Sequence, residues 1–216
     1  MQKINTNVSL ADQAYESLRQ SIVQGELHAD EELREENIAK QLGVSRTPLR
    51  DALRRLAMDG LVVLRKGKPA KVATFTMEDS LHLIEVRSLL EIHNIVTITP
   101  HITEERVQQL RENLFAQKNA IKDEDYESFV ELDREFHLLL TEDNPNTKLQ
   151  ELIHQMNSGD YRAFIILSNT LSPSAEVAYG EHHHILEAIE NRDTEKAKET
   201  MEHHMANIRK RLTQSN

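Results

Sequence analysis

Residues 38–59, IAKQLGVSRTPLRDALRRLAMD, decide the fold of this chain, because they predict two short helices joined by a tight turn. Gly43 ends the first helix, and Ser45 is a favoured N-cap residue for the second. A different face of the second helix from the apolar one carries Arg46, Arg50 and Arg54. Packing of the core therefore does not explain these three arginines. Such a row of side chains is typical of a helix that enters the major groove of DNA.

The segments around this stretch complete a small domain. Residues 11–24 and 36–42 have the apolar spacing of helices. LVVLR at 61–65 and AKVATF at 70–75 are β-rich runs on either side of KGKP, which is a hairpin signal. Three helices and a hairpin predict a winged helix-turn-helix domain over residues 1–75.

The remaining residues, 76–216, predict a second domain made only of helices. A long helix follows residue 76, and no strand pattern appears after Phe75. Further helical patterns cover about 103–122, 125–141, 147–171, 174–191 and 194–212. The fold class expected for the whole chain is therefore mainly α, with a winged helix-turn-helix domain followed by an all-α antiparallel bundle.

Composition limits the kind of protein. The chain has 216 residues and no cysteine, so it is long enough for a real core and has no disulfide framework. Its first residues, MQKINTNVSL, lack the apolar run of a signal peptide, and no apolar stretch approaches the roughly 20 residues that span a bilayer. We therefore expect a cytoplasmic protein with no membrane partner.

A net charge of −10 is unusual for a protein that binds nucleic acid, but the charge is unevenly distributed. Residues 43–73 hold 8 basic and 2 acidic side chains, whereas residues 78–216 hold 14 basic and 26 acidic ones. A local basic face is sufficient for DNA binding even on an acidic protein, because its Lys and Arg side chains neutralise phosphates and release their counterions. The acidic part is interpreted as the solvated surface of the helical bundle.

The arginine row has the chemistry to read bases. A guanidinium fork bonds guanine O6 and N7 together, which a single ammonium cannot do. Arg46 and Thr47 lie at the helix N-terminus, which meets base edges or holds a phosphate, and Arg50 follows one turn later. Gly67 at the hairpin tip allows the backbone to approach a groove closely. The alternative is a solvated hairpin whose charges only prevent edge pairing.

Eleven histidines are many for this length, and helical phase sorts them. Asp133 and His137 lie one turn apart at the edge of an apolar face. Only His182 of the run 182–184, and only His204 of the pair 203–204, is in phase with apolar neighbours. Three imidazoles and a carboxylate facing one interior predict a divalent metal, with zinc first and nickel, manganese or iron as other choices. The alternative is histidines that are satisfied by hydrogen bonds alone.

The first domain resembles a known family. LGVSRTPLRDAL at 42–53 and DGLV at 59–62 closely resemble the GntR family of bacterial transcription regulators, and KGKPAKV at 66–72 resembles the wing of its FadR branch. The resemblance implies a homodimer on a palindromic double-stranded DNA operator, with the wing in the minor groove. The DNA-binding residues that it implies are Arg34, Arg46, Thr47, Arg50 and Gly67. One departure is the acidic HADEE at 28–32, where the family has Pro-Gly.

The second domain resembles the FCD ligand-binding domain of the FadR-type regulators. The motifs that carry this resemblance are Asp133-x-x-Phe136-His137, Glu181-His182, and Met201 followed by His204. In that family such positions hold a divalent metal that helps to bind a small organic acid. The ligands that the resemblance implies are Asp133, His137, His182 and His204, with His183 and His203 open as substitutes.

Two arginines are candidates for binding the carboxylate effector. EVR at 85–87, followed by Leu90 and Glu91, matches the first helix of FCD domains, which points to Arg87. The alternative for Arg87 is an ordinary helix pair with Glu91. Arg162, next to Tyr161 on a middle helix, is the second candidate.

Three functions are compatible with these patterns. The chain is expected to be a metabolite-responsive transcription regulator, not an enzyme. A metal-dependent hydrolase-like enzyme with a structural helix-turn-helix is disfavoured, because the sequence has no HExxH-type arrangement and no nucleophile signature. A DNA-binding protein with a purely structural metal is the third choice.

Overall fold

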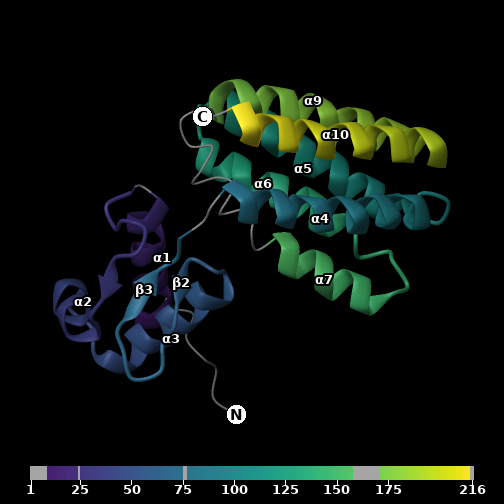
Figure 1. Ribbon diagram of the computed structural model, residues 1–216. Coiled ribbons are helices and arrows are strands. Elements are labelled where there is room, and N and C mark those ends of the chain that lie inside the picture. Colours follow the sequence, from purple (N-terminus) through teal and green to yellow (C-terminus); the bar gives the residue numbers. More distant parts are fainter. Residues whose placement is uncertain (1–8, 24, 75–76, 158–170, 215–216) are drawn as a thin grey trace, which may run out of the picture. The chain divides into compact units, whose positions relative to one another are not determined.

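The computed structural model describes residues 9–23, 25–74, 77–157 and 171–214 of the chain. The chain divides into two compact units, Met1–Phe75 and Thr76–Asn216. Figure 1 shows the first unit as helices with short strands and the second as helices alone. The fold class expected from the sequence, mainly α with a winged helix-turn-helix followed by a helical bundle, is confirmed.

The first unit is built around the helix that carries the arginine row. Its helices are α1 (Leu10–Val23), α2 (Glu35–Leu42) and α3 (Arg46–Met58). α3 packs against α1 and α2 through a face with Leu49 and Leu56, which have no exposed surface. Leu18 of α1 is also buried. Burying one such side chain contributes about 1.5–3 kcal/mol, so this apolar face fixes which side of α3 points outward.

A small antiparallel sheet completes the first unit. Its strands are β1 (Glu32–Leu33), β2 (Val62–Val63) and β3 (Ala70–Val72), in the order β1-β3-β2. β2 and β3 form the expected hairpin, with Val62 opposite Val72. β1 was not expected, because two residues are too few to show a strand period. Its pairing with β3 depends on how distant segments come together.

The second unit is a helical bundle. Its described helices are α4 (Met77–Ile98), α5 (Glu104–Lys122), α6 (Tyr126–Leu139), α7 (Thr147–Asn157), α9 (Leu171–Glu190) and α10 (Thr194–Gln214). Figure 1 shows α9 and α10 side by side, and α7 beside α4. α5 packs against both α6 and α9. None of the described helices combines the length and the hydrophobicity needed to cross a bilayer.

The helix boundaries agree closely with the sequence patterns, with one difference. α9 begins at Leu171, three residues before the expected start. Pro173 then lies in the first turn of α9. Backbone N–H groups in the first turn have no acceptor within the helix, so a proline, which lacks an N–H, is tolerated there. The helix expected over 147–171 is described as far as Asn157, and residues 158–170 lie outside the described part of the chain.

The core of the bundle is apolar, but it encloses a set of polar side chains. Phe136, Ile185 and Leu110 are among its fully buried members. Several polar residues of the described part are equally buried, with no exposed surface, and they include Glu91, Gln117, His137, His182 and His204. Burying a polar group is costly unless it has a partner. The partners of these side chains therefore define the candidate site.

Candidate functional site

The exposed face of α3 presents the predicted DNA-reading side chains. Arg46, Thr47 and Arg50 are all exposed, because the buried face of the helix lies on the other side. Ser45 occupies the N-cap with an extended backbone, although its side chain makes no capping hydrogen bond. The backbone amides of the first turn are thus open to another acceptor, as an approaching phosphate would need.

Each predicted arginine of this surface has a carboxylate close by. Arg50 Nε donates to both carboxylate oxygens of Glu35, at 2.9 and 2.8 Å. Arg46 Nη2 lies 3.5 Å from Glu36 Oε2, and Arg34 Nη2 lies 3.9 Å from Glu32 Oε2. Exposed pairs of this kind are worth about 0.2–1 kcal/mol each, so DNA phosphates or bases can replace them. Glu35 also raises the pKa of Arg50, which keeps its charge.

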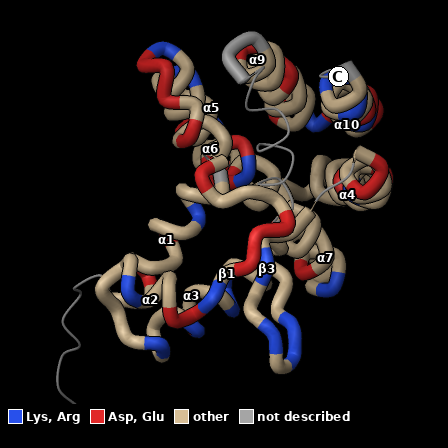
Figure 2. The backbone as a smooth tube through the Cα atoms, turned by 60° about the vertical axis from the view of Figure 1, so that its left-hand side comes forward, with Lys and Arg blue, Asp and Glu red and all other residues tan. Residues whose placement is uncertain are grey.

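The hairpin between β2 and β3 forms a basic tip. Gly67 is exposed, its φ is +72°, and a Cβ added there would meet nothing within 4 Å. Lys66 and Lys68 flank it and are exposed. Arg65 instead braces the hairpin, since Nη2 donates to the Pro69 carbonyl at 2.9 Å. Figure 2 shows Lys and Arg on both arms of this hairpin.

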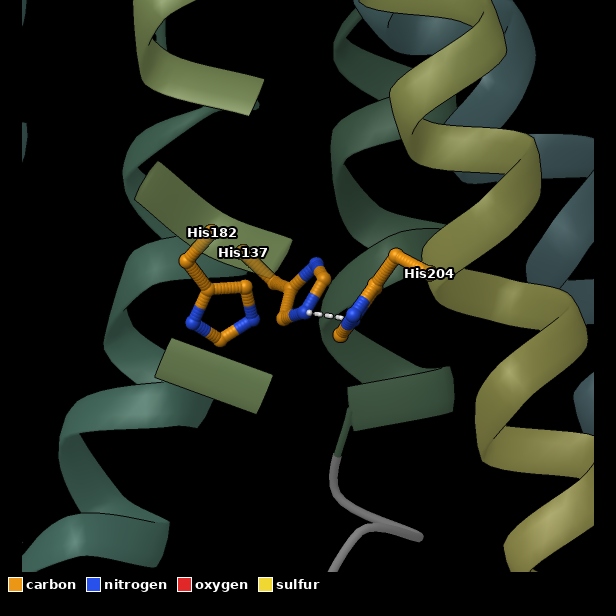
Figure 3. A group of neighbouring side chains, drawn as sticks. All are labelled: His137, His182 and His204. Carbon is orange, nitrogen blue, oxygen red and sulfur yellow. Dashed lines mark hydrogen bonds between the residues drawn. The ribbon is translucent and has the colours of Figure 1, made fainter. Parts of the chain in front are cut away.

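A second group of predicted residues converges inside the bundle. His137 of α6, His182 of α9 and His204 of α10 place one ring nitrogen each within 4.8 Å of one another. Figure 3 shows the three rings turned toward a common centre. Nε2 of His137 and Nε2 of His204 are 3.1 Å apart. Three helices thus bring together side chains that lie far apart in the sequence.

Asp133 lies at the edge of this cluster. Its Oδ1 is 3.5 Å from His182 Nε2, and its side chain is 22% exposed. The structure therefore brings the three predicted histidines together and places Asp133 beside one of them. His183 and His203 lie on the exposed sides of their helices; His183 contacts the Tyr179 ring, and His203 accepts a hydrogen bond from Asn207. They are not part of the cluster.

The outer nitrogen of each imidazole faces a hydrogen-bond acceptor. His204 Nδ1 donates to Glu181 Oε2 at 2.7 Å, and His182 Nδ1 lies 3.0 Å from Gln117 Oε1. His137 Nδ1 lies 3.4 Å from Glu91 Oε1. Histidines that bind a metal through one nitrogen nearly always have such a partner on the other.

The sequence patterns did not identify these three acceptors as part of the site. Glu181 is buried although it is off the phase of His182, because it also accepts from Asn207 and Arg211 of α10. Burial alone would raise the pKa of Glu181, but the bonds from His204 and Arg211 bring it below the usual value. The only signal in the sequence was its place beside His182.

The electrostatics of the cluster fit a cation. Burial lowers the pKa of His182 well below its usual value, and it also lowers the pKa of His204 against the opposing effect of Glu181. With its hydrogen on Nδ1, neutral His204 directs a lone pair from Nε2 at His137 Nε2. Within the described part of the chain, the buried Nε2 of His182 has no hydrogen bond.

Nitrogen lone pairs that face one another repel unless a positive charge lies between them. A hydrogen between two rings removes the repulsion at one contact only. A metal ion would accept the lone pairs of all three nitrogens at once. Imidazole and carboxylate ligands suit zinc, nickel and iron. The residues present therefore fit a divalent metal.

A buried ion pair lies next to this cluster. Arg87 Nε is 3.3 Å from Glu91 Oε1, and Asn157 Nδ2 is also 3.3 Å from that oxygen. Burial would raise the pKa of Glu91, but His137 and Arg87 lower it to about 2. The helix pair considered from the sequence is thus present, and it is buried against the histidines. Arg162, the other effector candidate, lies outside the described residues.

Comparisons with known proteins give consistent matches. Residues 10–72 match the family model for bacterial regulatory proteins of the gntR family, and residues 82–207 match the FCD domain. The HTH-type transcriptional regulator YdhC of Bacillus subtilis (strain 168) is 30% identical over 87% of this chain and 84% of its own length. The HTH-type transcriptional repressor RspR of Escherichia coli (strain K12) is 27% identical over 98% of this chain and 92% of its own.

The fold is also found among solved structures. The E. coli protein McbR/YncC superposes with a TM-score of 0.76 and 24% identity, and the match covers 97% of this chain and 100% of that one. A GntR regulator from Rhodococcus sp. RHA1 superposes with a TM-score of 0.77 at 21% identity, covering 95% of this chain and 98% of the other. At these identities the likeness shows a shared fold.

Proposed function

Because the chain belongs to the gntR family of bacterial regulatory proteins and carries an FCD domain, we propose that it is a metabolite-responsive transcription regulator. The observation that carries the sensing part of this proposal is the buried convergence of His137, His182 and His204. The regulator acts in the cytoplasm, where bacterial DNA lies, and its role needs no catalysis. Repression is the favoured mode, since RspR is named a repressor.

In this proposal the first unit binds a palindromic operator as part of a homodimer. Arg46, Thr47 and Arg50 read base edges in the major groove, and Arg34 holds the phosphate backbone. Gly67 lets the hairpin tip approach the minor groove. The exposure of all five residues and the absence of a Cβ at the tip support these roles.

The second unit binds a divalent metal and a small carboxylate effector. His137, His182, His204 and Asp133 would hold the metal, with zinc preferred over nickel, manganese and iron. The bound metal would supply a Lewis-acidic position for an effector oxygen. Arg87 contacts Glu91, which faces His137 of the cluster, and Arg87 would bind the effector carboxylate. Arg162 is a further candidate for this role. Binding would change operator affinity by a coupling free energy of about 1–3 kcal/mol.

The proposal is tested by metal analysis joined to thermal unfolding. We expect purified protein to contain a divalent metal, and a panel of small organic acids to raise the melting temperature only when the metal is present. His182→Ala and His204→Ala should abolish this rise. His183→Ala and His203→Ala make the same change at the neighbouring exposed positions and serve as matched controls, which should keep it.

Two outcomes would contradict the proposal. If chelation leaves the acid-induced rise unchanged, the metal has no part in sensing. If the metal-loaded protein hydrolyses ester substrates, and His204→Ala removes that turnover, the hydrolase-like alternative is favoured. A metal that resists exchange, together with no response to any acid, would favour the purely structural metal.

A further inference from the structure

A chain of two buried amides connects His182 to the backbone of α6. Gln117 Oε1 lies 3.0 Å from His182 Nδ1, and Gln117 Nε2 lies 2.8 Å from Asn113 Oδ1. Asn113 Nδ2 in turn lies 3.0 Å from the Leu132 carbonyl and 2.9 Å from Glu135 Oε2. Gln117 has no exposed surface and Asn113 has 5%. Both amides belong to α5, one turn apart, and face α6 and α9.

The far end of this chain fixes its direction. A backbone carbonyl and a carboxylate only accept hydrogen bonds, so the Asn113 group that faces Leu132 and Glu135 has to be the NH₂. The opposite orientation would place an oxygen against two other oxygens. Asn113 Oδ1 therefore faces Gln117, and Gln117 must donate to it through Nε2. This leaves Gln117 Oε1, an acceptor, facing His182.

The orientation of Gln117 also determines the tautomer of His182. Because Gln117 Oε1 accepts, His182 Nδ1 has to carry the ring hydrogen. Nε2, the nitrogen near Asp133, is then the unprotonated one and has a lone pair for a metal. Phe136 stacks on the His182 ring with centroids 4.3 Å apart and planes 19° apart, which restricts its rotation.

We propose that Gln117, held in orientation by Asn113, is a positioning residue that keeps the His182 hydrogen on Nδ1 and so presents Nε2 to the metal. This inference rests on the metal site proposed above. It also distinguishes His182 from His204, whose acceptor is the carboxylate of Glu181. A neutral amide sets the tautomer of His182 without adding negative charge to the buried site.

A purely structural role for Gln117 makes a different prediction. If the amides only satisfied one another in the core, the position of the His182 hydrogen would not matter, and loss of Gln117 would change stability without changing metal affinity. The metal affinity of a variant at position 117 therefore separates the two roles, and the tautomer of the metal-free protein tests the orientation from which the inference starts.

The first experiment measures that tautomer in the full chain without metal. A long-range ¹H–¹⁵N NMR spectrum of the histidine rings, with His182 assigned by its absence in His182→Ala, reports which nitrogen is protonated. We expect hydrogen on Nδ1 as the dominant form. Hydrogen on Nε2 as the dominant form, or an even mixture, would overturn the inference whatever the variants do.

The second experiment measures Zn²⁺ affinity by competition with a chromophoric chelator. Gln117→Met keeps the shape but removes the acceptor, and we expect it to weaken Zn²⁺ binding about 10–100-fold. Gln117→Glu restores an acceptor for His182 Nδ1 and should keep both the tautomer and the affinity, although its second oxygen faces Asn113. Gln108→Met makes the same change on the exposed side of α5 and should leave the affinity as in the wild type.

The outcomes separate this inference from the proposed function. Tight Zn²⁺ binding by the wild type with equal affinity for Gln117→Met would overturn the role of Gln117 and leave the metal site standing. No Zn²⁺ binding by the wild type, with hydrogen on Nδ1 of His182, would contradict the proposed metal and support the fixed tautomer. Circular dichroism of each variant confirms that it is folded before its affinity is compared.

Discussion

Replacing Glu181 by glutamine removes one negative charge from the contact between α9 and α10 and keeps the side-chain shape. In the wild type, one carboxylate oxygen accepts from His204 Nδ1 at 2.7 Å. The other accepts from Asn207 at 2.7 Å and from Arg211 at 3.1 Å. All three partners donate, so the NH₂ group of glutamine faces a donor in either orientation.

The size of the effect follows from these contacts. Leaving a buried donor such as His204 Nδ1 without its acceptor costs about 1–3 kcal/mol. Losing the charge opposite Arg211, whose side chain is 18% exposed, adds up to about 1 kcal/mol. Glu181→Gln should therefore lower the free energy of unfolding by about 1–4 kcal/mol, which is a substantial part of the total of roughly 5–15 kcal/mol for a domain.

Urea denaturation of chelator-treated protein, followed by circular dichroism, measures this loss without a contribution from bound metal. The midpoint should fall while the slope with urea stays constant, because the surface exposed on unfolding is unchanged. Glu187→Gln, on the exposed side of the same helix, is the matched control and should stay within about 0.5 kcal/mol of the wild type. A Glu181→Gln protein as stable as this control would refute the reasoning.

Three further changes test other parts of the molecule. Arg50→Ala should lose about 1–3 kcal/mol of operator discrimination in mobility-shift titrations at fixed salt, and an equal loss on unrelated DNA would contradict base reading. Gly67→Ala should destabilise the hairpin by about 1–2 kcal/mol in urea, because its φ of +72° is unfavourable for a residue with a Cβ. Tyr15→Phe loses a 2.6 Å hydrogen bond to Asp59 and should cost about 1 kcal/mol at neutral pH. Burial and that bond raise the pKa of Tyr15, so the wild type should lose this stability above about pH 10, while the variant should show no such alkaline loss.

Much of the fold was accessible from local patterns. The apolar spacing and the glycine stops predicted α2, α3 and the bundle helices to within a few residues of their observed bounds, apart from the end predicted for the helix that begins at Thr147, which lies outside the described residues. Helical phase also separated His182 from His183, which the structure places in the interior and on the surface respectively. These predictions succeed because spacing along a helix decides which side chains share a face.

Other features had no local signal. The two-residue strand β1 exists only through its pairing with β3, where Glu32 lies opposite Lys71. Glu91 was considered only as a partner of Arg87, yet it also faces His137 across the core. Both contacts join segments that lie far apart in the chain, and no periodicity within one segment can predict them.

The sequence by itself determined most of the helix boundaries, which faces are apolar, and that three histidines turn toward one interior with an aspartate at its edge. Only the tertiary structure decided which group accepts from each imidazole, because the acceptors of His182 and His204 come from other helices. Spacing sets the direction of a side chain from its own helix axis, whereas its hydrogen-bond partner depends on the packing of neighbouring helices, which only the folded chain establishes.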